Sequence, residues 1–144
     1  MKNIWLIIGA GGSFLVAVLH VFVIVQGAEA YRYFGAGEEF ARASDAGLLF
    51  PAIATSVIVL IFSVLGVYAL SGAGVVRALP FFRAVILFTG TMYTLRGLAL
   101  VVELSAALNL FAWRDGIRAQ DPYFSLVSLC LGLIHLWGWR MLRS

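Results

Sequence analysis

Arg96 and Glu103 are two charged residues inside an apolar stretch, residues 84–108, that is long enough to cross a membrane. A charge at the centre of a membrane-spanning helix costs about 2.5–3.5 kcal/mol on insertion scales, so such residues usually face a protein interior or a watery cavity. On a helix with 3.6 residues per turn, Thr89 and Tyr93 share with them a stripe about 80° wide. The opposite side is almost wholly aliphatic. The spacing therefore predicts a polar stripe that faces other parts of the protein.

His20 is an ionisable residue in another apolar stretch, residues 4–25, and it continues a face of small residues spaced four apart. Such a face lets another helix approach closely. A rise of 1.5 Å per residue places His20 about 24 Å, and Arg96 about 20 Å, from the basic ends of their segments. These similar heights predict a pocket open to the outer face. The residues expected to line it or to lie at its mouth are His20, Tyr93, Arg96, Glu103, Glu29 and Arg32.

His135 is expected to lie apart from this pocket. Its apolar stretch, residues 123–139, enters the membrane from the outer side, which places His135 roughly 18 Å down, toward the other half. A haem held by two histidines needs both to face one ring, and the heights of His20 and His135 do not match. The histidines also lack a carboxylate at the three- or four-residue spacing of metal motifs. We therefore expect no metal and no cofactor.

The composition places the chain among membrane proteins. Of its 144 residues, 62% are hydrophobic and only 12% are charged, whereas soluble domains have about 25% charged residues. The prediction is one all-α membrane domain, residues 1–144, in which four transmembrane helices form an antiparallel bundle. The expected spans are residues 4–25, 48–70, 84–108 and 123–139, and the outer loop is residues 26–47.

The distribution of charge predicts the orientation of the chain. One side of the membrane would hold basic residues and no acidic ones: Lys2, Arg77, Arg83, Arg140 and Arg143. All acidic residues of the loops would lie on the other side, with the remaining loop arginines. The positive-inside rule then places both termini in the cytoplasm of a multi-pass protein of the plasma (inner) membrane. Because the basic residues are spread thinly and not clustered on a soluble face, we expect no nucleic-acid partner.

The outer loop, residues 26–47, is the longest polar connection in the chain. Gly35 and Gly37 should break any helix there, and residues 38–46 could form a short surface helix. A loop of this length is often functional, for example as a lid. Its aromatic residues equally suit a tether anchored at the membrane interface. Both interpretations stay open.

The order of segments resembles the DoxX-type group of small four-helix bacterial membrane proteins. The likeness rests on a first span followed by a long outer segment, GAEAYRYFGAGEEFA, and by paired spans. It covers most of the chain in layout and involves no specific motif. The resemblance implies a four-helix membrane fold and no particular functional residue.

Three functions are compatible with these patterns. The first is binding, and by extension modification, of a lipid or apolar small molecule, because arginine suits carboxylate or phosphate, and histidine and glutamate suit acid–base chemistry. The second is a structural or accessory subunit, in which the polar stripe only fixes helix packing. Its partner would be a second copy or another membrane subunit. The third is a proton-coupled conduit, whose route to the cytoplasm would need His135 and the serines of its segment.

Overall fold

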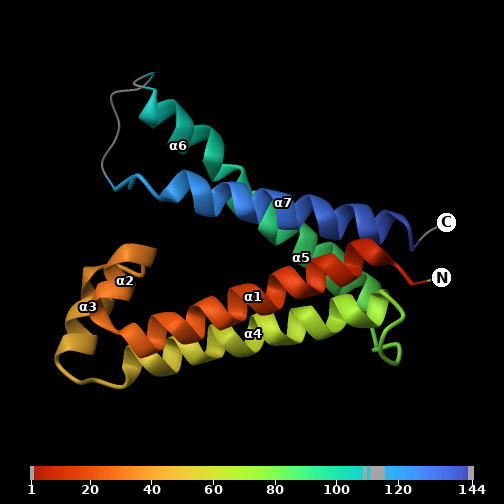
Figure 1. Cartoon of the computed structure of the whole chain (residues 1–144), viewed down its shortest axis with the longest axis horizontal. Helices are drawn as coiled ribbons and strands as arrows, with labels where there is room; N and C mark the ends of the chain where they lie inside the picture. The colour runs from red at the N-terminus through yellow and green to blue at the C-terminus, as the bar shows by residue number, and fades with distance from the viewer. Residues whose placement is uncertain (1, 109, 111–115, 143–144) are drawn as a thin grey trace. The chain divides into compact units, whose positions relative to one another are not determined.

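The computed structural model describes residues 2–108, 110 and 116–142, and the regular elements within them are α-helices. Four helical stretches of this part of the chain are long and apolar enough to cross a membrane. They are α1 (Ile4–Gln26), α4 (Phe50–Gly72), α5 with α6 (Phe82–Gly97 and Ala99–Ala107) and α7 (Asp121–Arg140), as Figure 1 shows. Their bounds lie close to those expected, because each follows a long and mainly apolar run. Arg114, Asp115 and Arg143 lie outside the described residues.

The side chains of α4 show why these helices need an apolar solvent. Ile53, Leu60 and Val64 are between half and two-thirds exposed. In water, each Å² of apolar surface that stays exposed on such a side chain would cost about 25 cal/mol of free energy relative to burial. A lipid environment removes that cost, and four candidate spans with this exposure indicate a multi-pass membrane protein.

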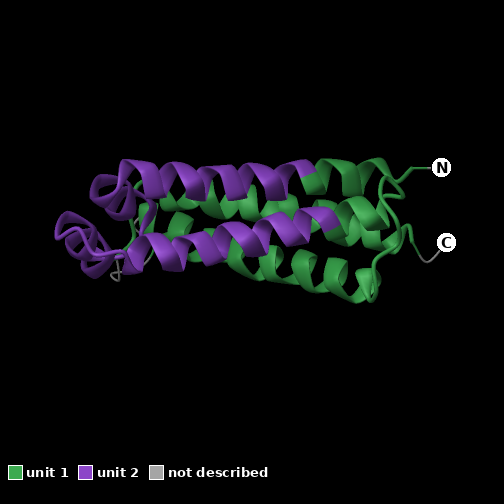
Figure 2. Ribbon diagram, turned by 90° about the horizontal axis from the view of Figure 1, so that it is seen from below, with its two compact units in different colours: residues 1–10, 68–144 green, residues 11–67 purple. Residues whose placement is uncertain are grey.

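Contacts between residues divide the chain into two compact units, which Figure 2 colours separately. The first unit comprises residues 1–10 and 68–144, and the second comprises residues 11–67. The expectation of one four-span domain stays a prediction, as do its bundle topology and its orientation.

In the first unit, α5 and α7 pack closely because small residues lie at their contact (Figure 1). A Cβ atom on Gly97 would come within 2.5 Å of the backbone of Leu129, and one on Gly132 would meet the backbone of Thr94 at 2.6 Å. The contacts step forward along α5 and backward along α7, so the two helices are antiparallel. Small residues at such a contact let helix backbones approach where lipid supplies no hydrophobic driving force.

The first turns of α1 also belong to the first unit. Asn3 Nδ2 donates to the carbonyl of Gly138 at 2.8 Å, and Asn3 N donates to that of Ala73 at 3.2 Å. Leu6 is fully buried against Ala73 and Ile86. The start of α1 is therefore held firmly against the end of α7.

The second unit contains the rest of α1, most of α4, and two short helices, α2 (Ala28–Phe34) and α3 (Glu38–Asp45). The surface helix expected near residues 38–46 is therefore confirmed, whereas α2 was not expected. Gly35 ends α2 with a left-handed φ of 82°, which a residue without Cβ adopts at little cost. Tyr31 is 2% exposed and packs against Phe40, with ring centroids 5.9 Å apart. The hydroxyls of Thr55 and Tyr31 lie within hydrogen-bond distance of each other, 3.3 Å apart. The outer loop is thus folded into two short helices that pack against α4 within the second unit.

Candidate functional site

The third candidate span is interrupted beside its charged residues. Helix α5 ends at Gly97 and α6 begins at Ala99, where sequence analysis expected one helix. Leu98 N still donates to Thr94 O at 2.9 Å, but Val101 N donates to Leu98 O, three residues before it, at 3.1 Å. This spacing is that of a 3₁₀ turn, which is tighter than an α-helix. The interruption therefore falls between Arg96 and Glu103.

Three side chains of the first unit form what we call the Arg96 site: Arg96, Glu103 and Ser125. Arg96 Nη1 donates a hydrogen bond to Ser125 Oγ at 2.5 Å and lies 3.7 Å from Glu103 Oε1. The second distance is an ion pair but too long for a hydrogen bond. The Glu103 side chain is 10% exposed, whereas that of Arg96 is 50% exposed. The guanidinium is thus anchored on one side and open on the other.

Hydrogen bonding at the Arg96 site is incomplete. A guanidinium has five N–H donors, and among the described residues Arg96 makes one hydrogen bond, to Ser125. Glu103 Oε2 is buried and has no hydrogen-bond partner in the same part of the chain. Unpaired polar groups are expensive at membrane depth, so the site is suited to a further polar group.

Ser125 was missing from the residues expected at the site. It lies on α7, is fully buried, and comes from a segment far from Arg96 along the chain. The signal available in the sequence was its spacing from Gly132 and His135, which puts all three on one face of a helix. Only the pairing of α5 with α7 shows which arginine that face meets.

His135 does not lie apart from the expected set, and this corrects the estimate made from helix rise. Its ring centroid is 5.6 Å from that of Tyr93, at an interplanar angle of 34°. Tyr93 precedes Arg96 by nearly one turn, about 4.5 Å. In the antiparallel pair, Tyr93 therefore faces the level of His135 while Arg96 reaches toward Ser125. The estimate failed because it compared His135 with His20 and did not place Tyr93, which lies nearer to the level of His135 than Arg96 does.

The imidazole of His135 is fully buried inside the first unit. Its Nδ1 donates to the carbonyl of Leu131 at 2.8 Å, and its Nε2 is buried without a hydrogen-bond partner among the described residues. Gly9 of α1 covers the ring so closely that a Cβ there would lie 2.8 Å from Cε1 and 3.0 Å from Nε2. This leaves no room for a metal ion at Nε2. Across the described residues, no group of three or more histidine, cysteine or acidic side chains could hold a metal.

The other expected site residues lie in the second unit. His20 is half-buried, donates from Nδ1 to the carbonyl of Val16 at 2.8 Å, and packs against Phe62 with ring centroids 5.4 Å apart. Glu29 is exposed on α2. The idea that His20, Glu29 and Arg32 share a pocket with the residues of the first unit stays a prediction.

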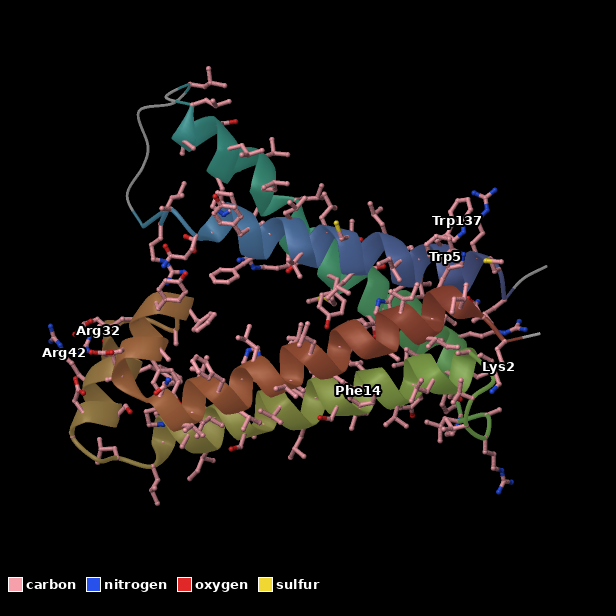
Figure 3. The ribbon with its side chains drawn as sticks, viewed as in Figure 1. Lys2, Trp5, Phe14, Arg32, Arg42 and Trp137 are labelled. Atoms are coloured by element: carbon pink, nitrogen blue, oxygen red, sulfur yellow. The ribbon has the colours of Figure 1, made fainter. Side chains whose placement is uncertain are left out.

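Arg32 takes part in an ion-pair cluster at the surface of the second unit (Figure 3). Its Nε lies 3.0 Å from Glu38, its Nη2 lies 2.9 Å from Asp45, and Arg42 approaches Glu38 at 3.3 Å. The hydrogen bond from Arg32 lowers the pKa of Glu38, and the same bond raises the pKa of Arg32. Arg32 therefore holds α2 to α3.

No family model, curated protein or solved structure matches this chain. The resemblance in layout to the DoxX-type group stays a prediction.

Proposed function

We propose that this multi-pass membrane protein binds an amphiphile with an acidic group, a lipid or an apolar small molecule, at the Arg96 site. One observation carries the proposal: a half-exposed guanidinium in a candidate span has unused donors, although Ser125 holds it in place. Ionisable residues in membrane spans are functional candidates by default. The N–H donors of Arg96 that make no hydrogen bond within the described residues are therefore available to a ligand.

The ligand's acidic group follows from the chemistry of arginine. A guanidinium presents a planar fork of donors that matches carboxylate or phosphate through two parallel hydrogen bonds. The apolar part of the ligand follows from the surroundings, since Leu95, Leu98 and Val102 expose aliphatic surface near the site in sequence. Without ligand, Glu103 partly neutralises Arg96 from 3.7 Å. An incoming anion would complete the hydrogen bonds that Glu103 leaves unmade.

The competing interpretation is that the Arg96 site only fastens α5 and α6 to α7. The two interpretations differ in what Glu103 does. In a fastening network, loss of either charge leaves the other unpaired, which costs about 3–5 kcal/mol when the pair is fully buried. In a ligand site, loss of the Glu103 charge removes a competitor for Arg96. The two charges should then have opposite effects on binding.

Lipid retention in mild detergent tests the proposal. Native mass spectrometry would compare oleate with oleyl alcohol, which has the same chain and no charge. We expect the protein to prefer oleate, Arg96→Gln to abolish that preference, and Glu103→Gln to strengthen it. Arg42→Gln is the matched control, because Arg42 also pairs with a glutamate, at 3.3 Å, but outside the spans.

A different result would support the fastening network. If both variants lose thermal stability to a similar extent and the lipid preference stays as in the wild type, the network only fastens helices. Circular dichroism in the same detergent confirms that each variant is folded before lipid is added.

A further inference from the structure

A groove runs along the first unit where the start of α1 meets the end of α7. It has a volume of about 490 Å³ and is lined by Trp5, Leu133, Ile134, Leu136, Trp137 and Arg140. We call it the Trp5 groove, and Figure 3 labels the two tryptophans on it. It shares no residue with the Arg96 site. We propose that the Trp5 groove binds an anionic phospholipid, with one acyl chain along its apolar wall and the phosphate on Arg140.

The lining of the groove matches both parts of such a lipid. Five of its six side chains are apolar or aromatic, and the sixth is the guanidinium of Arg140. That guanidinium lies 6.0 Å from the centre of the Trp137 ring, a cation–π distance, and remains exposed. Tryptophan is enriched at the level where acyl chains meet headgroups. The groove therefore places a positive charge at the headgroup end of an apolar wall.

The groove is preformed because its two walls are joined beneath it. Asn3 Nδ2 is hydrogen-bonded to Gly138 O at 2.8 Å, and Leu6 is fully buried at the same contact. On α7, the buried face carries His135 and Gly138, while Leu133 and Trp137 lie on another face and are exposed. A rigid groove loses little conformational freedom when a chain enters it.

The charge around the groove selects an anionic headgroup. The segments of the first unit at this end, residues 2–10, 73–86 and 134–142, contain no acidic residue. They carry four basic residues, Lys2, Arg77, Arg83 and Arg140. Basic residues near a membrane surface each favour anionic lipids by about five-fold, and basic pockets between spans bind lipid phosphates.

A transmembrane helix of a partner fits the groove less well. Helices that pack within membranes meet through glycine, alanine, serine or threonine, which let their backbones approach. The Trp5 groove is lined by two tryptophans and by branched side chains, with none of these small residues. A flexible acyl chain can follow such an uneven wall. The observations therefore favour a lipid.

Competition between two lipids with identical chains tests the inference. The intact protein, in neutral detergent, would be mixed with equal amounts of dioleoyl phosphatidylglycerol and dioleoyl phosphatidylcholine, and native mass spectrometry would measure the retained ratio. We expect a preference of about five-fold for phosphatidylglycerol that Arg140→Gln removes. Leu133→Trp, which fills the groove from an exposed position, should lower retention of both lipids.

Arg83→Gln is the matched control. Arg83 belongs to the same acid-free end and also lies 6.0 Å from an aromatic ring, that of Phe82, but it does not line the groove. Its loss should leave the preference intact. If Arg83→Gln and Arg140→Gln reduce the preference equally, the attraction is diffuse and the groove is not a site.

Two further outcomes would also overturn the inference. One is unchanged retention in Leu133→Trp. The other is displacement of the lipid by water-soluble glycerol phosphate at the lipid's own concentration, which would mean that the groove does not hold the chain. Thermal denaturation in detergent shows that the variants remain folded. Because Arg96→Gln leaves the Trp5 groove untouched, failure here and failure of the proposed function can be told apart.

Discussion

The arginines Arg96 and Arg32 differ in how fully they are paired and in whether their surroundings are lipid or water. Arg96 lies in a candidate span with one hydrogen bond to Ser125 and an ion pair at 3.7 Å. Arg32, at the surface of the second unit, pairs with two carboxylates, those of Glu38 and Asp45. Water can solvate the exposed guanidinium of Arg32, whereas lipid cannot solvate that of Arg96. At the residue scale, the incomplete pairing of Arg96 within a candidate span is therefore the basis for the proposed ligand site.

The Arg32 cluster predicts that the contact between α2 and α3 weakens in acid. The hydrogen bond from Arg32 lowers the pKa of Glu38, so this pairing is fully present at neutral pH. It is lost as the pH falls through that lowered value. Hydrogen exchange of the α2 and α3 amides should therefore accelerate in acid more than in the remaining helices, after correction for intrinsic rates.

Glu38→Gln should remove most of this pH dependence. Glu39→Gln is the matched control, because Glu39 is the neighbouring exposed carboxylate of α3 and makes no ion pair with the described residues. Equal effects of the two substitutions would show that the cluster does not hold α2 to α3.

At the scale of elements, the contact between α5 and α7 builds the Arg96 site. Gly97 and Gly132 bring the two backbones together, and this antiparallel pairing sets Arg96 opposite Ser125 and Tyr93 opposite His135. The interruption after Gly97 then starts α6 next to the guanidinium. A change in the distance between these helices should therefore disturb the site as well as the fold.

Gly97→Ala should destabilise the protein although alanine is the better helix former. Its Cβ would lie 2.5 Å from the backbone of Leu129, so α5 must move away from α7. Overpacking of this kind typically costs about 1–3 kcal/mol. Thermal denaturation in detergent should show a lower midpoint than for the wild type.

Gly11→Ala supplies the comparison, since Gly11 is also a helical glycine in a candidate span. A Cβ at Gly11 would have no neighbour within 4 Å, so propensity alone should raise or preserve the midpoint. Similar midpoints for the two variants would contradict the close packing of α5 on α7.

At the scale of the whole molecule, apolar surface and charge point to a membrane environment. The described part of the chain includes four candidate spans, and aliphatic side chains of α4 remain exposed along its length. The acid-free segments of the first unit contrast with the ion-pair cluster of the second. The positive-inside rule predicts that the acid-free segments lie in the cytoplasm, and this orientation stays a prediction.

Labelling of single cysteines tests this orientation. Cys130 would first be replaced by serine, and cysteine would then be introduced at the exposed positions Ala36 or Val76. An impermeant maleimide should label Ala36→Cys in intact spheroplasts, and Val76→Cys only after permeabilisation. The reverse pattern would mean that both termini face outward.

The sequence by itself determined the four candidate spans, because membrane-length apolar runs are local and survive any arrangement of the helices. It also identified Arg96 and Glu103, because a charged residue in an apolar run can be recognised without knowledge of the fold. The short helix α3 followed from the glycines before it.

Only the tertiary structure decided which side chains meet. Ser125 and His135 come from α7, and their partners depend on the register between antiparallel helices, which two glycines allow and which helix rise alone did not predict. The interruption at Leu98 was equally hidden, because leucine is a good helix former. The register arises from contacts between segments distant in sequence. The sequence therefore identified the charged residues of the site, but it did not identify the side chains that surround them.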